Sequence, residues 1–238
     1  GGTMPQTVST ATEAVIFTGI PGSHIGIHAH NDTEHAVANS LAAIEAGARH
    51  IQGTLNGLGE RCGNANLVSI IPTLLLKEPY KSKYKLNVDL EKLSQLTSIS
   101  RALDDVLNRV PLKQSAYVGA SAFAHKAGLH ASAILKSPET YEHVSPDLVG
   151  NQRVIPMSNQ AGQSNLRMRL NEANLSVEKN DPNLLQILDE IKRREDQGYA
   201  YDSAQASFEL LARQHLGRMP KFFEVKRYKV TVERRKNK

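Results

Sequence analysis

Two histidines separated by one residue, His28 and His30, have the types and spacing to hold a metal ion. They end a short alternating run, 24–30, of the kind that forms a β-strand. Side chains at positions i and i+2 of a strand share one face, so both imidazoles can approach one divalent cation. The spacing leaves open the alternative of two hydrogen-bonded structural histidines.

A glycine-rich loop that ends at Asn64 follows the next predicted strand and offers further polar groups. Asn64 is a candidate third metal ligand at the start of a predicted helix. Glu60 and Arg61 supply a carboxylate and an anion-binding guanidinium, and we count them with Thr54 as candidate substrate-binding residues. The alternatives are a helix cap at Asn64 and a local Glu60–Arg61 ion pair.

Four predicted elements position these groups. The pattern is strand, helix, strand, helix, over 24–30, 34–46, 50–55 and 64–76. Such alternation is typical of parallel βαβ units, and α/β barrels place their active sites at the carboxyl ends of the strands. Two such units fill about 75 residues, whereas a closed barrel of eight takes roughly 250. The sequence therefore predicts the last βα units of a barrel.

The rest of the chain is predicted to be mostly helical. Further helices are expected at 90–110, 121–135, 183–197 and 202–215, with a strand-like stretch at 222–233. His125 and His130 lie in the second of these regions, and five residues apart they do not share a helix face. One of them could act as a general acid or base, although a structural role for His125 stays open. Tyr141 could donate a phenolic proton or be a packing residue.

Composition excludes several classes of protein. The 238 residues are 40% hydrophobic and 22% charged, which argues against wholesale disorder. No apolar run reaches the roughly 18 residues of a membrane span, no export signal is visible, and the one cysteine, Cys62, favours a reducing cytoplasm. The tail 221–238 holds 8 basic and 2 acidic residues, and the other 21 basic and 22 acidic residues nearly balance. We therefore expect neither nucleic acid nor membrane as a partner.

Taken together, these motifs resemble a known family. The sequence is similar to the acyl-CoA-condensing barrel enzymes, which are the isopropylmalate, homocitrate and citramalate synthases of the DRE-TIM metallolyase group. The matching stretches are GIHAHNDT at 26–33, GTLNGLGERCGN at 53–64, SAFAHKAGLH at 121–130, TYEHV at 140–144 and SNQAGQSN at 158–165. Region 195–211 is most similar to the citramalate synthase branch.

The resemblance implies an α/β fold of three parts. Residues 1–80 would be the C-terminal part of a TIM (β/α)8 barrel, and 81–218 would be helical linker subdomains. Residues 219–238 would be the truncated start of a C-terminal allosteric domain. It also implies a divalent metal (Mg²⁺, Mn²⁺ or Zn²⁺) held by His28 and His30 with Asn64 adjacent, and completed by an aspartate from the first barrel strand.

The implied reaction joins acetyl-CoA to a 2-keto acid and releases CoA after hydrolysis. The family's catalytic histidine corresponds to His130 and its tyrosine to Tyr141. Both lie in the linker subdomain and are supplied to the barrel of the other subunit, so a homodimer is implied.

Other readings remain at this point. Isopropylmalate or homocitrate synthase is the alternative within the family. A metal-dependent hydrolase would need further histidines at later strand ends, where the next strand offers Thr54 and Asn56. A degenerate remnant that only dimerises would bind metal weakly or not at all.

The chain by itself is predicted to be inactive, because the first six barrel strands of the family are missing, and with them the metal aspartate and the substrate-binding arginine. We expect no CoA release from acetyl-CoA and pyruvate in the presence of Mg²⁺ or Mn²⁺, as followed with a thiol reagent. Clear turnover by the purified chain would contradict the interpretation as a fragment.

Overall fold

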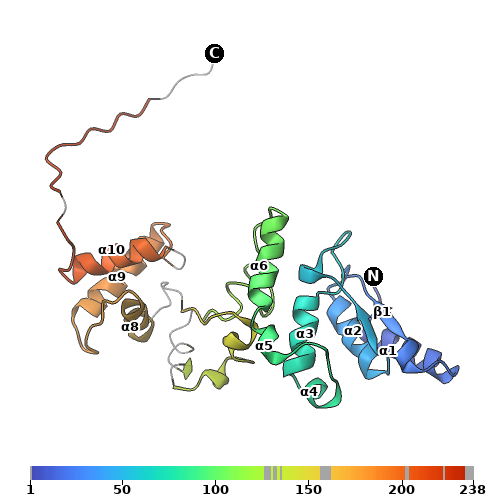
Figure 1. Cartoon of the computed structure of the whole chain (residues 1–238). Helices are drawn as coiled ribbons and strands as arrows, with labels where there is room; N and C mark the ends of the chain where they lie inside the picture. The colour runs from blue at the N-terminus through green and yellow to red at the C-terminus, as the bar shows by residue number, and fades with distance from the viewer. Residues whose placement is uncertain are drawn as a thin grey trace. The chain divides into compact units, whose positions relative to one another are not determined.

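The computed structural model describes residues 2–125, 130, 133–134, 136–155, 162–201, 204–221 and 223–233 (Figure 1). The chain divides into two compact units, one over 1–125 and 130–155, the other over 126–129 and 156–238. Within the described residues, no helix combines the length and the apolar character that crossing a membrane requires.

The first unit contains a two-stranded parallel sheet. Strand β1 (Gly26–His28) pairs with β2 (His50–Gln52), and His28 lies opposite Gln52. Helix α2 (Ala36–Glu45) connects the strands and packs on α1 (Pro5–Phe17), as Figure 1 shows in blue. The predicted parallel βαβ unit is confirmed, with shorter strands than expected.

The sheet has one apolar and one polar face. Ile27 and Ile51 pack against small and branched side chains of the helices, Ala43, Ile44, Ile70 and Leu74 among them. His28 and Gln52 point to the other face, where both are exposed. Period-two alternation therefore buries the aliphatic side chains under the helices and leaves the imidazole accessible.

Beyond β2 come η2 (Leu55–Gly57) and helix α3 (Leu67–Leu76). The expected helix start at Asn64 is wrong by three residues, because the side chain of Asn66 caps α3 by accepting the Val68 N–H at 3.0 Å. Helix α1 begins at Pro5, since proline fits the first turn of a helix.

The helix predicted over 90–110 is broken into α5 (Leu90–Leu93) and α6 (Leu96–Val106), after α4 (Tyr80–Lys83). Gly150 packs so closely on the carbonyl oxygen of Ser94 that a Cβ there would lie 1.8 Å from it. This contact from η4 (Pro146–Val149) lies at the break, so the helix is interrupted by a segment that sequence periodicity does not reveal.

The helix predicted over 121–135 is wrong in its first part. Residues 121–125 form turns and a parallel bridge, in which the His125 N–H donates to Val154 at 2.9 Å and the Val154 N–H donates to Phe123 at 3.0 Å. Phe123 is buried in the core of this unit, and that burial overrides the local helical pattern. Residues 126–129, 131, 132 and 135 lie outside the described residues, and η3 (Pro138–Thr140) follows.

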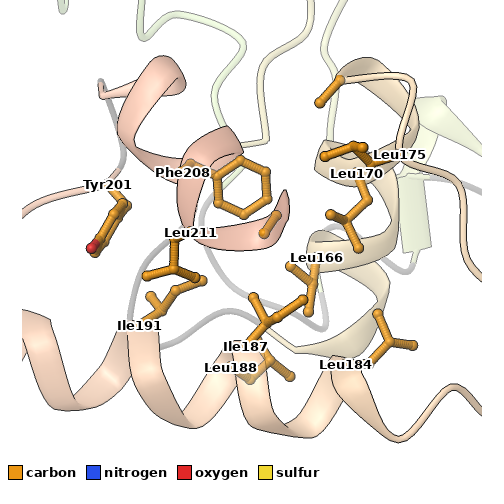
Figure 2. Close-up of a cluster of buried hydrophobic side chains, with 12 residues drawn as sticks. Leu166, Leu170, Leu175, Leu184, Ile187, Leu188, Ile191, Tyr201, Phe208 and Leu211 are labelled. Carbon is orange, nitrogen blue, oxygen red and sulfur yellow. The ribbon is translucent and has the colours of Figure 1, made fainter. Parts of the chain in front are cut away.

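The second unit is built on three helices, α8 (Gln163–Glu172), α9 (Asn183–Asp196) and α10 (Gln205–His215). The helices expected at 183–197 and 202–215 are confirmed with small shifts at their ends, whereas α8 was not predicted. Figure 2 shows aliphatic side chains of all three helices meeting Phe208, which is fully buried. The unit therefore has a hydrophobic core of its own.

The strand-like stretch expected at 222–233 does not form a strand over the described residues 223–233. It runs as an extended chain beyond α10 (Figure 1). Val225, Tyr228, Val230 and Val232 are exposed. The side chains have strand propensity, but a strand also needs a neighbour for its backbone hydrogen bonds, and no described segment pairs with it.

Replacing Ile187 with Ala should lower the free energy of unfolding of the second unit by about 2–5 kcal/mol, because Ile187 is completely buried in the three-helix core. Leu185→Ala is the matched control on the same helix, since Leu185 is 55% exposed and should cost less than about 1 kcal/mol. Urea unfolding followed by circular dichroism measures both, and equal losses would contradict the described core.

Candidate active site

The two predicted metal-binding histidines lie at the carboxyl end of β1. Their ring centroids are 5.1 Å apart with an interplanar angle of 66°. The Nδ1 of His28 lies 2.9 Å from Oε1 of Gln52, its partner across the strands. Because an amide oxygen accepts, Nδ1 carries the proton, and the lone pair of His28 is therefore on Nε2.

His30 is paired with Asn64 through the backbone. The Asn31 N–H donates to Gly63 at 2.8 Å and the Ala65 N–H donates to Ala29 at 2.9 Å, on either side of the His30–Asn64 bridge. Gly63 has φ +92°, and a Cβ there would lie 2.1 Å from the carbonyl oxygen of Gly57. Glycine is therefore required where the loop returns to the strand.

The side chains of His30 and Asn64 each keep an unused acceptor. Nδ1 of His30 and Oδ1 of Asn64 are buried without a hydrogen-bond partner. An imidazole nitrogen and an amide oxygen of this kind, beside the Nε2 lone pair of His28, are donors that a divalent cation accepts. The residues therefore fit a metal, although the described part of the chain holds no cluster of three or more His, Cys, Asp or Glu that could do so.

Arg61 is bound to a carboxylate of the preceding loop. Its Nε donates to Oδ1 of Asp32 at 2.7 Å, its Nη2 to Oδ2 at 3.1 Å, and Nη1 lies 3.5 Å from Glu60. The hydrogen bond from Arg61 lowers the pKa of Asp32 to about 2. The predicted local pair of Glu60 and Arg61 is present, but the bidentate partner is Asp32.

The hydroxyl of Thr54 is bound within the glycine-rich loop and does not point freely to solvent. Its hydroxyl donates to the carbonyl oxygen of Leu58 at 2.6 Å, and that oxygen also accepts from Nδ2 of Asn64 at 3.3 Å. Asn56 ties the loop to α6, since its amide oxygen accepts from the hydroxyl of Ser100 at 2.7 Å. The structure thus brings Thr54 and Asn64 together around one carbonyl group.

His130 and Tyr141 form a second pair, with ring centroids 4.3 Å apart. Tyr141 is 44% exposed, so its hydroxyl can reach solvent or a ligand. Among the described residues, no hydrogen bond, ion pair or ring contact joins this pair to His28, His30 or Asn64. The structure therefore gives two separate sets of candidate residues.

A buried ion pair lies directly beside Tyr141. The Glu142 side chain is 3% exposed and accepts from Nε and Nη2 of Arg153 at 2.5 and 2.6 Å. Nε2 of His125 lies 3.4 Å from the same carboxylate. Burial lowers the pKa of His125, and the hydrogen bond from Arg153 lowers the pKa of Glu142.

Two protein families and several individual proteins are similar to this chain. A family described as HMGL-like matches residues 1–99, and one described as homocitrate synthase post-HMGL domain-like matches 117–199. An (R)-citramalate synthase of Aquifex aeolicus is 44% identical over 237 residues, which is 100% of this chain and 44% of that protein. One of Synechocystis is 46% identical, over 97% of this chain and 42% of that protein.

The chain belongs to the family of isopropylmalate, homocitrate and citramalate synthases. This α/β fold is related to the TIM barrel. A probable 2-isopropylmalate synthase of Methanopyrus kandleri is less similar, at 34% identity over 82% of this chain and 37% of that protein. The chain spans less than half the length of each of these relatives.

Sequence reasoning missed three groups in this synthase family member. Gln52 orients His28, but finding it requires the strand register. His125 and Arg153 are the partners of the buried Glu142, and finding them requires knowledge of the bridge between Ala124 and Val154. The bidentate bond of Asp32 to Arg61 spans 29 residues and carries no local signal.

Arg61→Gln should return the pKa of Asp32 to about 4, because the hydrogen bond that stabilises the ionised carboxylate is lost. At about pH 3 the carboxylate would then be mostly protonated, whereas it stays ionised in the unchanged protein. Carboxyl ¹³C shifts measured by NMR follow the titration. Glu60→Gln is the control that leaves the Asp32 midpoint in place, and an unshifted midpoint in Arg61→Gln would exclude Arg61 as the cause.

Proposed function

We propose that the full-length protein carrying this chain is a citramalate synthase-like acyltransferase, EC 2.3.3 in type. Acetyl-CoA, pyruvate and water would give citramalate and CoA, a reaction that serves isoleucine and branched-chain amino-acid biosynthesis. The observation that carries the proposal is 41–46% identity to five (R)-citramalate synthases along nearly the whole chain. We place the enzyme in the cytoplasm, where Cys62, the one cysteine of this chain, which is free and exposed, would stay reduced.

In this proposal His28 and His30 hold a divalent cation (Mg²⁺, Mn²⁺ or Zn²⁺), with the amide oxygen of Asn64 beside them. The orphaned acceptors of His30 and Asn64 support this role. A bound cation would polarise the keto oxygen of pyruvate and favour attack at the keto carbon. Gln52 would keep the lone pair of His28 directed to the cation through its bond to Nδ1.

Arg61, Glu60 and Thr54 would contribute to substrate binding in different ways. Arg61 already donates two hydrogen bonds to Asp32, so binding a substrate carboxylate would require an exchange of partners. Glu60 is exposed and could adapt to the substrate. The hydroxyl of Thr54 is bound to Leu58, which favours an indirect role in shaping the rim.

His130 and Tyr141 would move the proton of the acetyl group. An imidazole can accept a proton near neutral pH, and the ring of Tyr141 at 4.3 Å places a phenol beside it. We propose that these residues act in the active site of the other subunit of a homodimer. The parts at 1–80, 81–218 and 219–238 remain the proposed domains.

A panel of keto acids tests the proposal on the full-length protein. We expect kcat/KM for pyruvate to exceed that for 2-oxoisovalerate and 2-oxoglutarate by about tenfold or more, since added substrate bulk changes discrimination by this order. CoA release with a thiol reagent is the measurement. A preference for 2-oxoisovalerate would instead favour isopropylmalate synthase. Two relatives with that name are 34% and 35% identical to this chain.

Control variants separate an enzyme from a remnant that only dimerises. His30→Ala should abolish both Mn²⁺ binding, measured by calorimetry, and CoA release. His24→Ala changes an exposed histidine in η1 (Gly22–His24) and should leave both unchanged. Absence of metal binding in the unchanged full-length protein would support the remnant.

A further inference from the structure

The carboxylate of Glu142 is the most deeply buried acidic group among those described with an ion-pair partner, with 3% of its side chain exposed. Arg153 occupies both carboxylate oxygens through a bidentate pair at 2.5 and 2.6 Å. A carboxylate can be buried in this way only when it is paired and hydrogen-bonded. Glu142 therefore has one well-defined place in the fold.

Tyr141 precedes Glu142, and the two neighbouring side chains differ in exposure. Both backbone N–H groups donate to the carbonyl oxygen of Pro138, at 3.2 and 3.0 Å, so the chain turns sharply here. Glu142 is buried, whereas Tyr141 is 44% exposed with its ring against His130. Fixing Glu142 in the interior thus fixes where the backbone presents Tyr141.

The residue after Glu142 is anchored as well. The ring of His143 stacks on Phe123 at 5.9 Å and meets the ring of Tyr117 edge-on at 5.2 Å. Its carbonyl oxygen accepts from Nζ of Lys77 at 2.5 Å. These contacts hold the backbone after Glu142. They do not involve Tyr141, so we attribute the direction of Tyr141 to the ion pair of Glu142.

The partners of Glu142 come from two bridged segments, one that precedes His130 in the chain and one that follows Glu142. Arg153 and His125 flank the Ala124–Val154 bridge, and the His125 N–H donates across it. Burial is the main cause that lowers the pKa of His125, the charges of Arg153 and His130 add to it, and the Glu142 carboxylate opposes it. The cluster therefore connects the residue next to Tyr141 with the bridged segment that ends at His125.

We propose that Glu142 is a positioning residue for the acyl condensation, which together with Arg153 and His125 holds the Tyr141 ring against His130. The inference rests on the proposed function, in which His130 and Tyr141 transfer the proton. Glu142 does not touch the substrate. It acts through Tyr141, and Arg153 is its necessary counter-charge.

The test uses Glu142→Gln in the full-length protein, because glutamine keeps the length of the side chain and removes its charge. We expect kcat for CoA release to fall about tenfold or more while KM for pyruvate and Mn²⁺ affinity change less than about twofold. Glu190→Gln is the matched control, since Glu190 is bound by Arg193 and Arg194 in the second unit and should change nothing in catalysis.

A second readout is independent of activity. In protein with ¹³C-labelled histidine, the ring of Tyr141 at 4.3 Å displaces the His130 imidazole resonances, and Tyr141→Ala defines the undisplaced position. Glu142→Gln should move these resonances to the position seen in Tyr141→Ala. Arg153→Lys keeps the charge but not the bidentate geometry, so it should move the His130 resonances part of the way. This variant replaces Glu142→Gln in the test if Glu142→Gln does not fold.

The outcomes separate the two proposals. A folded Glu142→Gln protein that keeps the His130 shift and kcat overturns the positioning role. A shift that is lost while kcat stays unchanged confirms the placement and overturns the catalytic role assigned to His130 and Tyr141. Loss of activity with the shift retained would also overturn positioning, since Glu142 would then act by another route.

Discussion

Two backbone hydrogen bonds, from Asn31 to Gly63 and from Ala65 to Ala29, hold the candidate metal site together. They attach the end of the glycine-rich loop to the residues that follow β1, and His30 is thereby fixed opposite Asn64. The bonds of Leu58 to Thr54 and Asn64 form within the loop that this attachment closes. The side-chain bond of Arg61 to Asp32 joins the same two segments, but the backbone bonds are what set His30 opposite Asn64.

The attachment has a cost in stability. Buried polar atoms without partners destabilise a fold by about 1–3 kcal/mol each, and His30 and Asn64, which are paired through the backbone bridge, each present one of them. Packing of Ile27 and Ile51 under the helices supplies favourable burial on the opposite face of the sheet. An apolar side chain at position 30 would avoid the cost but could not accept a cation, so the arrangement suits binding better than stability.

Local pattern was enough to predict the features that depend on periodicity. The alternation at 24–30 placed His28 and His30 at one strand end, and the apolar spacing of 183–196 predicted α9. The failures lie where distant residues intervene. Gly150 packs at the break between α5 and α6, and Val154 draws 123–125 out of a helix. Asn64 could not cap α3, because its backbone is paired with His30 and Asn66 takes that role.

The two sets of candidate residues are held by different physical means. The metal set depends on backbone hydrogen bonds and on glycine at position 63, so most side-chain changes around it leave its geometry in place. In the positioning role that we propose for Glu142, the His130–Tyr141 pair depends on a side-chain ion pair, whose geometry changes whenever Glu142 or Arg153 changes. Removing one partner leaves a buried charge unpaired, which costs several times more than an exposed pair contributes. The placement of the proposed proton-transfer pair is therefore expected to be more sensitive to single substitutions than the placement of the proposed metal ligands.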